Sequence, residues 1–565
     1  MKKILVILLT STLVIFGVNL GNFELLKFDF AETQSNIIFE NFDKKLTIET
    51  SADQIVNTIN ATDGIYVVLK LSIDGYEAQR PTSDDLSMEE VKTFLRDHRK
   101  KVREYHSQIN QEVMKELGLL SIDADAYYSS YAPYLFLTFE EDLTVENYDY
   151  IINTLETPYV ETIYFKKAKV ESALFEFESA IAGVNGTEII GSPLYTGLDV
   201  VIGILDEGIV DSSHDNFEGI NLSVRNEWWY SETVSEHATQ VASIAGGING
   251  IARESSILSV EVSGEPSGEI EWMLNRHVNV INMSFGYLSS SSLGDYTSEA
   301  AYIDYIVRNS FVTFVGSAGN RGDSDKYVTS PKTGYNVITV GATNDSGNLA
   351  YFSSYEEKFA ISKPTLVAPG SYISIPGFSG IHSGTSFSAP IVTGTVALIM
   401  QHRSLLLLYP EAIKALLTAN IQPLDGYTAF DSSGLEDKVG SGMLDISSTL
   451  EASSIIGNFY NDENVPGQDV YTKLVYLNAG QRIRIAAIWL VNSDKSASTN
   501  KVTDYDLFLY DGAVMKKSAR SGYNNVEFVD YTANSSGQYT IKVTLAASRK
   551  TSTADVGGVS YRIIG

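Results

Sequence analysis

Five short apolar runs that alternate with helical stretches constrain the fold of this chain more than any other feature. The runs are DVVIGIL (199–205), SILSVEV (256–262), VNVINMSF (278–285), FVTFVGSAG (311–319) and NVITVGA (336–342). Continuous apolar runs of this length are typical of strands buried on both faces, and their alternation with helices predicts a parallel α/β sheet. Ligands of such sheets bind beyond the carboxyl ends of the strands, so the residues that follow each run are the first candidates for a functional site.

A polar residue or a turn of small residues lies at the end of two of these runs. A third group of small residues precedes a later helix. The first run leads directly into Asp206, which a buried strand would anchor at the rim of the sheet, and the fourth ends in the small-residue turn Gly316–Asn320. Further along, GTSFSAP (384–390) precedes the helical run IVTGTVALIMQH. Small neighbours leave Ser386 uncrowded, and the start of the helix directs backbone N–H groups and a positive dipole end towards its hydroxyl.

The stretch SEHATQVASIAGG (235–247) predicts a helix with His237, one of seven histidines, in its first turn. Ser235 suits the N-cap and Gly246-Gly247 the end of the helix. One apolar face is formed by Ala238, Val241, Ile244 and Ala245. A lone histidine at a helix start is more often structural than a general base, and an aspartate or a small-residue loop alone is more often a turn.

In the order Asp206, His237, Asn320 and Ser386, these residues resemble the catalytic set of the subtilisin-like serine proteases (subtilases). The resemblance covers about residues 185–455, and the GTSFSAP motif in this context is specific, whereas DEG or HAT alone would be weak. The similar segments are DVVIGILDEGIVDSSHDNF, HATQVASIAGG, INMSFG, SPKTGYNVITVGA, LVAPG, SGTSFSAP, PEAIKALLTAN and GSGMLD.

The resemblance implies a serine-type endopeptidase. Ser386 would be the nucleophile and His237 the general base, while Asp206 would orient the imidazole and stabilise its cation. The backbone N–H of Ser386 and the side-chain amide of Asn320 would bind the oxyanion.

The resemblance also implies two substrate-binding segments. Ser284-Phe285-Gly286 would pair with an extended substrate backbone, and Ala318-Gly319 would form a wall of the primary specificity pocket. Glu207 stands where the family usually has a small hydroxyl residue, and we hypothesise that its charge raises the pKa of the His237 imidazole. The usual histidine block HGTHVAG is HATQVAS here, which places Ala238 and Gln240 beside the base.

No metal or cofactor is expected to be required for the chemistry. The tight calcium site of the family takes ligands from a loop after the histidine helix and from an aspartate soon after the catalytic one. Here that loop is the short GGINGIARES, and Asn216 takes the place of the aspartate, so we expect this site to be absent. Structural calcium elsewhere is an alternative, with candidate ligands Asp504, Asp506 and Asp511, but a solvated acidic surface is the favoured interpretation. The segment 263–277 contains Glu265, Glu269 and Glu271, which would be compatible with a preference for basic substrates.

The N-terminal third predicts export and a separate domain. Two lysines followed by the 15-residue apolar run 4–18 are typical of a secretory signal and short for a membrane span, although no clean cleavage site follows and an uncleaved anchor is the alternative. Residues 64–166 predict the order β-α-β-β-α-β of the ferredoxin-like motif, with a capping box at Ser87–Glu90 and Gly118 ending the first helix. This segment resembles subtilase propeptides, so we expect the propeptide to act as an intramolecular inhibitor that the enzyme itself removes by cutting between about Lys166 and Pro193. A permanently attached binding domain is the alternative.

The expected fold class is α/β: a parallel-sheet subtilisin-like catalytic domain, preceded by a ferredoxin-like α+β propeptide and followed by an all-β sandwich or jelly roll. The expected parts are a signal peptide (1–21), a polar linker (22–49), the ferredoxin-like propeptide domain (50–170), a linker with the processing site (171–184), the peptidase domain (185–455) and the β-sandwich domain (456–565).

Charge and cysteine content restrict the partners. A formal net charge of −29 argues against nucleic acid as a partner, because a phosphate backbone attracts lysine and arginine, and the absence of cysteine excludes thiol catalysis and disulfides. We therefore expect a secreted or cell-surface monomer that acts on protein or peptide substrates, without stable membrane insertion. A catalytically silent subtilase-like protein with a binding or adhesion role is the alternative.

Overall fold

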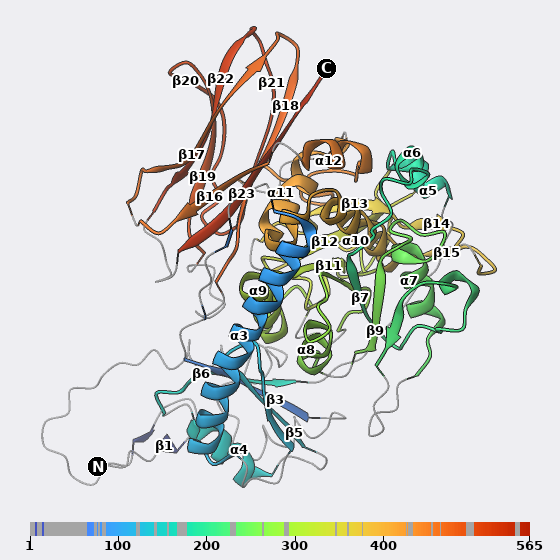
Figure 1. Ribbon diagram of the computed structural model, residues 1–565. Helices are drawn as coiled ribbons and strands as arrows, with labels where there is room; N and C mark the ends of the chain where they lie inside the picture. The colour runs from blue at the N-terminus through green and yellow to red at the C-terminus, as the bar shows by residue number, and fades with distance from the viewer. Residues whose placement is uncertain are drawn as a thin grey trace, which may run out of the picture.

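The computed structural model arranges the chain around one seven-stranded sheet, with further sheets before and after it in the sequence (Figure 1). It describes residues 6–7, 14–15 and 65–565, except for 73–75, 77–79, 82–85, 120–124, 140–143, 155–156, 167–177, 226–232, 263–264, 288–292, 345–346, 359–360, 376, 425, 428–432, 454–455, 464, 493–501 and 548–553. The polar linker (22–49), residues 171–177 of the processing linker and the predicted signal peptide lie outside the described residues. Two short strands of the signal region, β1 (Val6–Ile7) and β2 (Val14–Ile15), are the exception.

In the part of the chain that the structure describes, no helix is both long enough and apolar enough to cross a bilayer.

The central sheet has the order β13-β12-β11-β10-β7-β9-β8, and all its neighbouring strands are parallel. Its strands are β7 (Val201–Asp206), β8 (Leu222–Val224), β9 (Ser256–Glu261), β10 (Val280–Met283), β11 (Thr313–Ser317), β12 (Ile338–Thr343) and β13 (Leu366–Pro369). Each of the five predicted apolar runs coincides with one of these strands to within one residue at the carboxyl end or contains it, which confirms the predicted parallel α/β sheet.

Helices cover both faces of this sheet and form two apolar cores. The helices α7 (Glu236–Gly246), α10 (Thr385–His402) and α11 (Pro410–Ala419) contribute to one core, and α8 (Ser267–Leu274) and α9 (Ser298–Ser310) to the other. Shorter elements are α5 (Glu178–Gly183), α6 (Thr187–Ile190), η4 (Asp215–Phe217), η5 (Ser404–Leu408), α12 (Ile446–Ala452) and the hairpin β14 (Ser371–Ile373) and β15 (His382–Ser383).

The N-terminal part has the predicted β-α-β-β-α-β order. It comprises β3 (Ile65–Leu71), α3 (Met88–Glu116), β4 (Asp125–Tyr128), β5 (Tyr134–Phe139), α4 (Val145–Asn153) and β6 (Val160–Lys166). The sheet order is β4-β5-β3-β6 with every pair antiparallel, which is the arrangement of the ferredoxin-like motif. The Ser87–Glu90 capping box is present, and Gly118 follows the helix with φ +68°, a conformation that glycine adopts readily.

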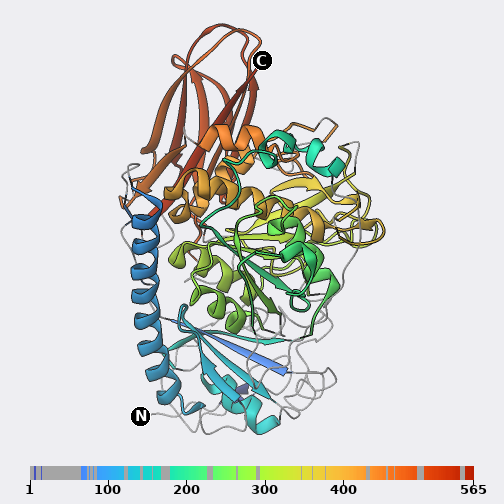
Figure 2. The same ribbon diagram turned by 45° about the vertical axis from the view of Figure 1, so that its right-hand side comes forward.

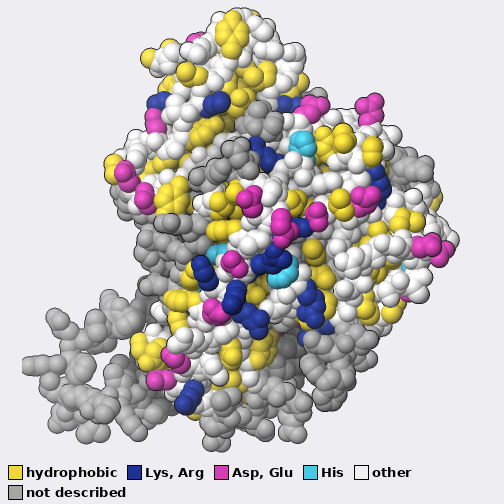
Figure 3. All heavy atoms as spheres, in the orientation of Figure 1, with side chains coloured by type: hydrophobic (Ala, Val, Ile, Leu, Met, Phe, Trp, Pro, Cys, Tyr) yellow, Lys and Arg dark blue, Asp and Glu magenta, His cyan; other side chains and the backbone are white. Residues whose placement is uncertain are grey.

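Helix α3 begins near the C-terminal sheets and runs along the side of the central part to the N-terminal sheet (Figure 2). Its buried face contacts backbone oxygens at the end of α9 and before β10: Arg99 donates to the oxygens of Ser310 (2.8 Å) and Val278 (2.7 Å), and His98 Nε2 lies 2.6 Å from the oxygen of Asn309. Lys and Arg side chains gather over the middle of the face in Figure 3, although the chain is acidic overall.

The C-terminal part consists of two antiparallel four-stranded sheets, β16-β23-β18-β21 and β17-β22-β19-β20. Side chains from both sheets form one apolar core around the buried Trp489, which confirms the predicted all-β sandwich. The strands are β16 (Gly457–Asn461), β17 (Asp469–Leu477), β18 (Arg482–Trp489), β19 (Tyr505–Asp511), β20 (Val514–Ala519), β21 (Val526–Thr532), β22 (Gly537–Leu545) and β23 (Asp555–Ile564).

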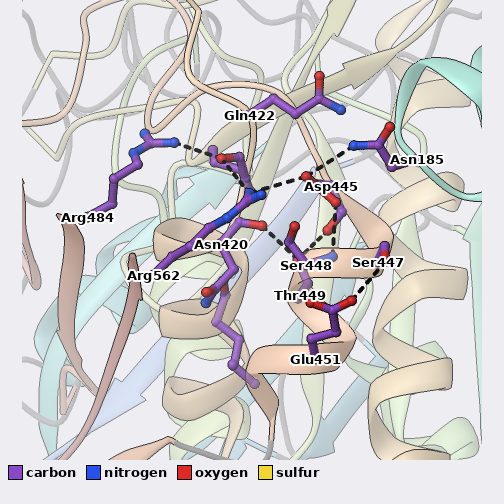
Figure 4. A network of polar contacts seen from close by, with 12 residues as sticks. Asn185, Asn420, Gln422, Asp445, Ser447, Ser448, Thr449, Glu451, Arg484 and Arg562 are labelled. Carbon is purple, nitrogen blue, oxygen red and sulfur yellow. Dashed lines mark hydrogen bonds and ion pairs between the residues drawn. The ribbon is translucent and has the colours of Figure 1, made fainter. Parts of the chain in front are cut away.

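A polar network joins the sandwich to the central part (Figure 4). Asp445 caps helix α12 by accepting from the backbone N of Ser448, and its other carboxylate oxygen accepts from Asn185 and from Arg562 of β23, each at 3.2 Å. Arg484 of β18 donates to the backbone oxygen of Ile421 at 2.8 Å. The network therefore holds together three segments that are far apart in the sequence.

Two of the three glutamates of segment 263–277 face the N-terminal sheet. Tyr127 contacts the Glu265 carboxylate at 3.2 Å, and Glu271 accepts from the Ser129 hydroxyl (2.5 Å) and the backbone N of Ser130 (3.0 Å). Glu269 pairs instead with Arg225 at 3.8 Å. A preference of these glutamates for basic substrates stays a prediction for a form without the N-terminal domain. Burial raises the pKa of Glu271 to about 7, although the hydrogen bonds from Ser129, Ser130 and Tyr302 oppose the rise.

We expect Glu271→Gln to reduce the loss of thermal stability at alkaline pH. Because the folded-state pKa of Glu271 lies above its ordinary value of 4.5, the native state favours the protonated carboxyl, and stability falls as pH rises from about 4.5 through about 7. A glutamine does not ionise, so the free energies of unfolding of variant and wild type, obtained from thermal unfolding, should differ little at pH 5 but by about 1–2 kcal/mol at pH 8. Glu218→Gln, at an exposed site, is the control. Parallel pH dependences for all three proteins would contradict this role of Glu271.

Candidate active site

Two strands and two helices bring the predicted site residues to one edge of the central sheet. Asp206 is the last residue of β7, and Asn320 lies three residues after the end of β11. His237 and Ser386 each occupy the second position of a helix, α7 and α10 respectively. The carboxyl ends of parallel strands share one edge, so residues that are distant in the sequence meet there.

Asp206 and His237 form a short buried hydrogen bond. Nδ1 of His237 lies 2.6 Å from Oδ1 of Asp206, which also accepts from the backbone N of Glu207 at 2.8 Å. Asp206 is fully buried and His237 is 7% exposed. Burial alone would lower the pKa of His237. The Asp206 charge, the hydrogen bond to Asp206 and the Glu207 charge together raise it by more than burial lowers it, so the pKa lies above its ordinary value of 6.5.

Glu207 adds a second carboxylate to this pair. The ligand atoms of Asp206, Glu207 and His237 all lie within 4.8 Å of one another, and these residues are the only group of three acidic or histidine side chains this close among the described residues. A metal ion would fit such a set by distance alone. Because Asp206 already engages Nδ1 of the imidazole, the geometry favours charge stabilisation of His237.

The Ser386 hydroxyl lies at the start of the buried helix α10. It donates to the backbone oxygen of Ser284 at 3.1 Å, while the Ser284 hydroxyl donates to the backbone oxygen of Ser386 at 2.8 Å. No described residue hydrogen bonds to Nε2 of His237, so the bond between nucleophile and base that the sequence leads one to expect is not formed. Rotation about the Cα–Cβ bond of Ser386 would exchange the Ser284 oxygen for another acceptor, and such contacts are often loose without substrate.

Asn320 is held by the residue that precedes the serine. Its side-chain oxygen accepts from the backbone N (2.9 Å) and the hydroxyl (3.0 Å) of Thr385. The same hydroxyl accepts from the backbone N of Gly319 at 3.0 Å. With its oxygen engaged, Asn320 presents its NH₂ group as a donor, and the Ser386 N–H lies in the first turn of α10.

The two predicted substrate-binding segments lie beside these groups. Phe285 is 1% exposed and its backbone oxygen accepts from the buried Lys332, whereas Ser284 faces Ser386. Ala318 is fully buried and accepts through its backbone oxygen from the N of Thr329 at 3.0 Å.

Lys332 is a buried cation that the sequence analysis missed. Burial lowers its pKa to about 7, and the Asp206 carboxylate opposes this shift. The one sequence signal was a lysine directly before a buried apolar strand, in SPKTGYNVITVGA, but most lysines in such positions extend into solvent.

Helix α7 is buried on all sides, so the prediction of a single apolar face was incomplete. All ten residues from His237 to Gly246 are buried, while the predicted N-cap Ser235 accepts from the backbone N of Ala238. Gln240 donates to Glu236 at 3.1 Å and lies 3.4 Å from Nδ1 of His382. Both unusual neighbours of His237 are therefore packed into the interior.

The candidate calcium ligands have other polar partners. The Asn216 amide donates to the Ser243 hydroxyl at 3.0 Å. In the sandwich, Asp511 pairs with Lys516 at 3.2 Å and Asp506 with Arg520 at 3.9 Å. Burial and the neighbouring Asp504 raise the pKa of Asp506 to about 6, while Arg520 opposes the shift.

The central part of the chain is similar to known proteins. A family profile described as "Subtilase family" (Peptidase S8) matches residues 197–442. Subtilisin amylosacchariticus from Bacillus subtilis subsp. amylosacchariticus is 34% identical over an alignment of 230 residues, and the match covers 36% of this chain and 56% of that protein. The chain therefore spans little more than half the length of this relative.

A shorter relative is matched over more of its length. Subtilisin from Bacillus pumilus is 34% identical over 230 residues, with 36% of this chain and 78% of that protein covered. Among solved structures, the patellamide maturation protease PatA is similar at 27% identity with a TM-score of 0.38, and the match covers 46% of this chain and 97% of that chain. The family profile and the similarity to the Bacillus pumilus protein show that this chain belongs to the subtilase family.

Proposed function

We propose that this subtilase is a serine endopeptidase in which Asp206, His237 and Ser386 form the catalytic triad. The observation that carries the proposal is the 2.6 Å bond between buried Asp206 and His237 at the strand edge where Ser386 begins helix α10. In this role the aspartate fixes the tautomer of the imidazole and leaves Nε2 as the base.

The reaction would proceed by acyl transfer. Nε2 of His237 takes the proton of Ser386 as its oxygen attacks the peptide carbonyl, and the imidazolium then protonates the leaving amine. The Ser386 N–H and the Asn320 NH₂ bind the negative oxygen of the intermediate. Water repeats the sequence on the acyl-enzyme and frees the second product.

We further propose that the protein is made as a secreted zymogen and that residues N-terminal to α5 are removed by its own activity. Support comes from the apolar N-terminal run, the ferredoxin-like sheet and its docking on α8 and α9. Val184 is fully buried in the central core, and Asn185 bonds to Asp445. A cut before Glu178 leaves these contacts intact, which narrows the predicted range of Lys166–Pro193.

Replacing the nucleophile should abolish both chemistry and processing. We expect Ser386→Ala to lose labelling by an organophosphonate serine probe and to keep its full N-terminal domain, because no other group forms the acyl bond. Labelling measures the first effect and intact mass the second. Ser388→Ala, in the same helix, is the control. Labelling of Ser386→Ala at the wild-type level, or no labelling of processed wild type, would refute the triad.

Removing one oxyanion donor should slow turnover without preventing binding. We expect Asn320→Ala to lower kcat by about 10²–10³-fold with little change in KM, a magnitude known for one such donor in a subtilisin. The measurement is steady-state hydrolysis of a peptide amide by protein whose active sites have been counted. Asn344→Ala, which also alters a loop asparagine, is the control. A kcat within threefold of wild type would argue against Asn320 as an oxyanion donor.

Removing the second carboxylate should shift the pH profile. Glu207 raises the pKa of His237, so Glu207→Gln should lower it and move the acidic limb of kcat/KM to lower pH by about 0.5–1 unit. The pH dependence of kcat/KM between pH 5 and 9 measures the shift, with the exposed Glu254→Gln as control. A limb that stays in place or moves to higher pH would contradict the role of Glu207.

A further inference from the structure

The space between the two substrate-binding segments determines which residue can precede the cleaved bond. The attacked carbonyl must touch the Ser386 hydroxyl, which lies 3.1 Å from the backbone oxygen of Ser284, and its oxygen must reach the Asn320 amide. The residue that contributes this carbonyl therefore lies between segment 284–286 and segment 318–319. Its side chain points into the gap between Gly286 and Gly319.

The side chain of Thr329 occupies this gap. A Cβ atom added to Gly286 would lie 2.3 Å from Thr329 Oγ1, and one added to Gly319 would lie 3.0 Å from Thr329 Cγ2. One side chain thus lies directly against both glycines. Thr329 is only 3% exposed.

Backbone hydrogen bonds hold Thr329 in place from both sides. Its N–H donates to the oxygen of Ala318 at 3.0 Å, and the oxygen of the next residue, Ser330, accepts from the N–H of Tyr287 at 3.2 Å. The segment that carries Thr329 is therefore tied to both walls. Moving the Cα atom of Thr329 away from the gap would require breaking these bonds.

The level beneath Thr329 is filled as well. Nζ of Lys332 would lie 2.9 Å from a Cβ on Gly286, and its stem covers Gly316, where an added Cβ would lie 2.2 Å from Lys332 Cγ. Lys332 also donates to the backbone oxygen of Phe285. A long substrate side chain has no deeper room to enter.

We propose that Thr329 closes the primary specificity pocket and restricts cleavage to bonds that follow glycine, alanine or serine. This inference rests on the proposed endopeptidase function. It identifies Thr329 as a specificity-determining residue and peptides with small residues before the cleaved bond as the substrate class. One methylene too many in a tight pocket lowers kcat/KM by about 10–200-fold, so a leucine should be excluded strongly.

The test uses processed wild-type protein and two peptides that differ only in alanine or leucine before the cleaved bond. We expect wild-type kcat/KM to favour the alanine peptide by at least about 100-fold, and Thr329→Gly to raise the leucine-to-alanine ratio by about 10–200-fold. Thr329→Ser, which removes only the methyl group, should give an intermediate ratio. Ser324→Gly, on the same loop and exposed, is the control and should keep the wild-type ratio.

Active-site labelling of the wild type separates the two possible failures. If Ser386 is labelled and the wild type cleaves after leucine or phenylalanine as fast as after alanine, the closed pocket is wrong while the proposed function stands. If Ser386 is not labelled and neither peptide is hydrolysed, both are wrong. An unchanged leucine-to-alanine ratio in a folded Thr329→Gly, judged by its labelling, would also overturn the role of Thr329. If Thr329→Gly does not fold, the ratio of the wild-type kcat/KM values for the alanine and leucine peptides alone tests whether the pocket is closed.

Discussion

The rest of the site depends on how the buried carboxylate of Asp206 is stabilised. A fully buried charge is costly unless hydrogen bonds compensate it, and here they come from His237 and the backbone N of Glu207. Because His237 in the first turn of α7 must hydrogen bond to Asp206 at the end of β7, the start of this helix lies beside the end of that strand. Helix α10 packs on α7 so closely that a Cβ on Gly394 would lie 2.8 Å from the backbone oxygen of Ala245. The position of Ser386 therefore follows from the same pairing.

The three parts of the chain are joined by long cationic side chains that donate to backbone oxygens. Arg99 does so between α3 and the end of α9, and Arg484 between the sandwich and the central part. A guanidinium suits such places because its donors form a rigid fork and it keeps its charge when buried. The junction with the sandwich, which Asp445 and Arg562 reinforce, contains nothing that a processing cut before α5 would break. The docking of the N-terminal domain instead includes Glu271, and burial of its carboxyl raises its pKa, so that the docked state loses stability as the pH rises.

Local sequence patterns predicted the helices and strands of the fold, but they did not predict the contacts between segments that are distant in the sequence. The capping box at Ser87, the N-cap at Ser235 and the five buried strands depend on neighbours within a few residues, and the structure confirms them. Sequence gives no sign that Ser129 and Ser130 lie against Glu271. For the same reason neither the burial of Lys332 nor the contact of Thr329 with two glycines at least ten residues away was foreseen.

The buried lysine links the proposed specificity pocket to the charge of Asp206, the proposed aspartate of the triad. Lys332 fills the floor beneath Gly286 and also feels the Asp206 charge, which opposes the effect of burial on its pKa of about 7. Below that pH its ammonium partly offsets the Asp206 carboxylate, and above it this carboxylate has less compensation. The same carboxylate raises the pKa of His237, so the lysine and the histidine both respond to one buried charge. A change in the pocket floor that removed the lysine would therefore alter the charge around Asp206 as well as the fit of the substrate.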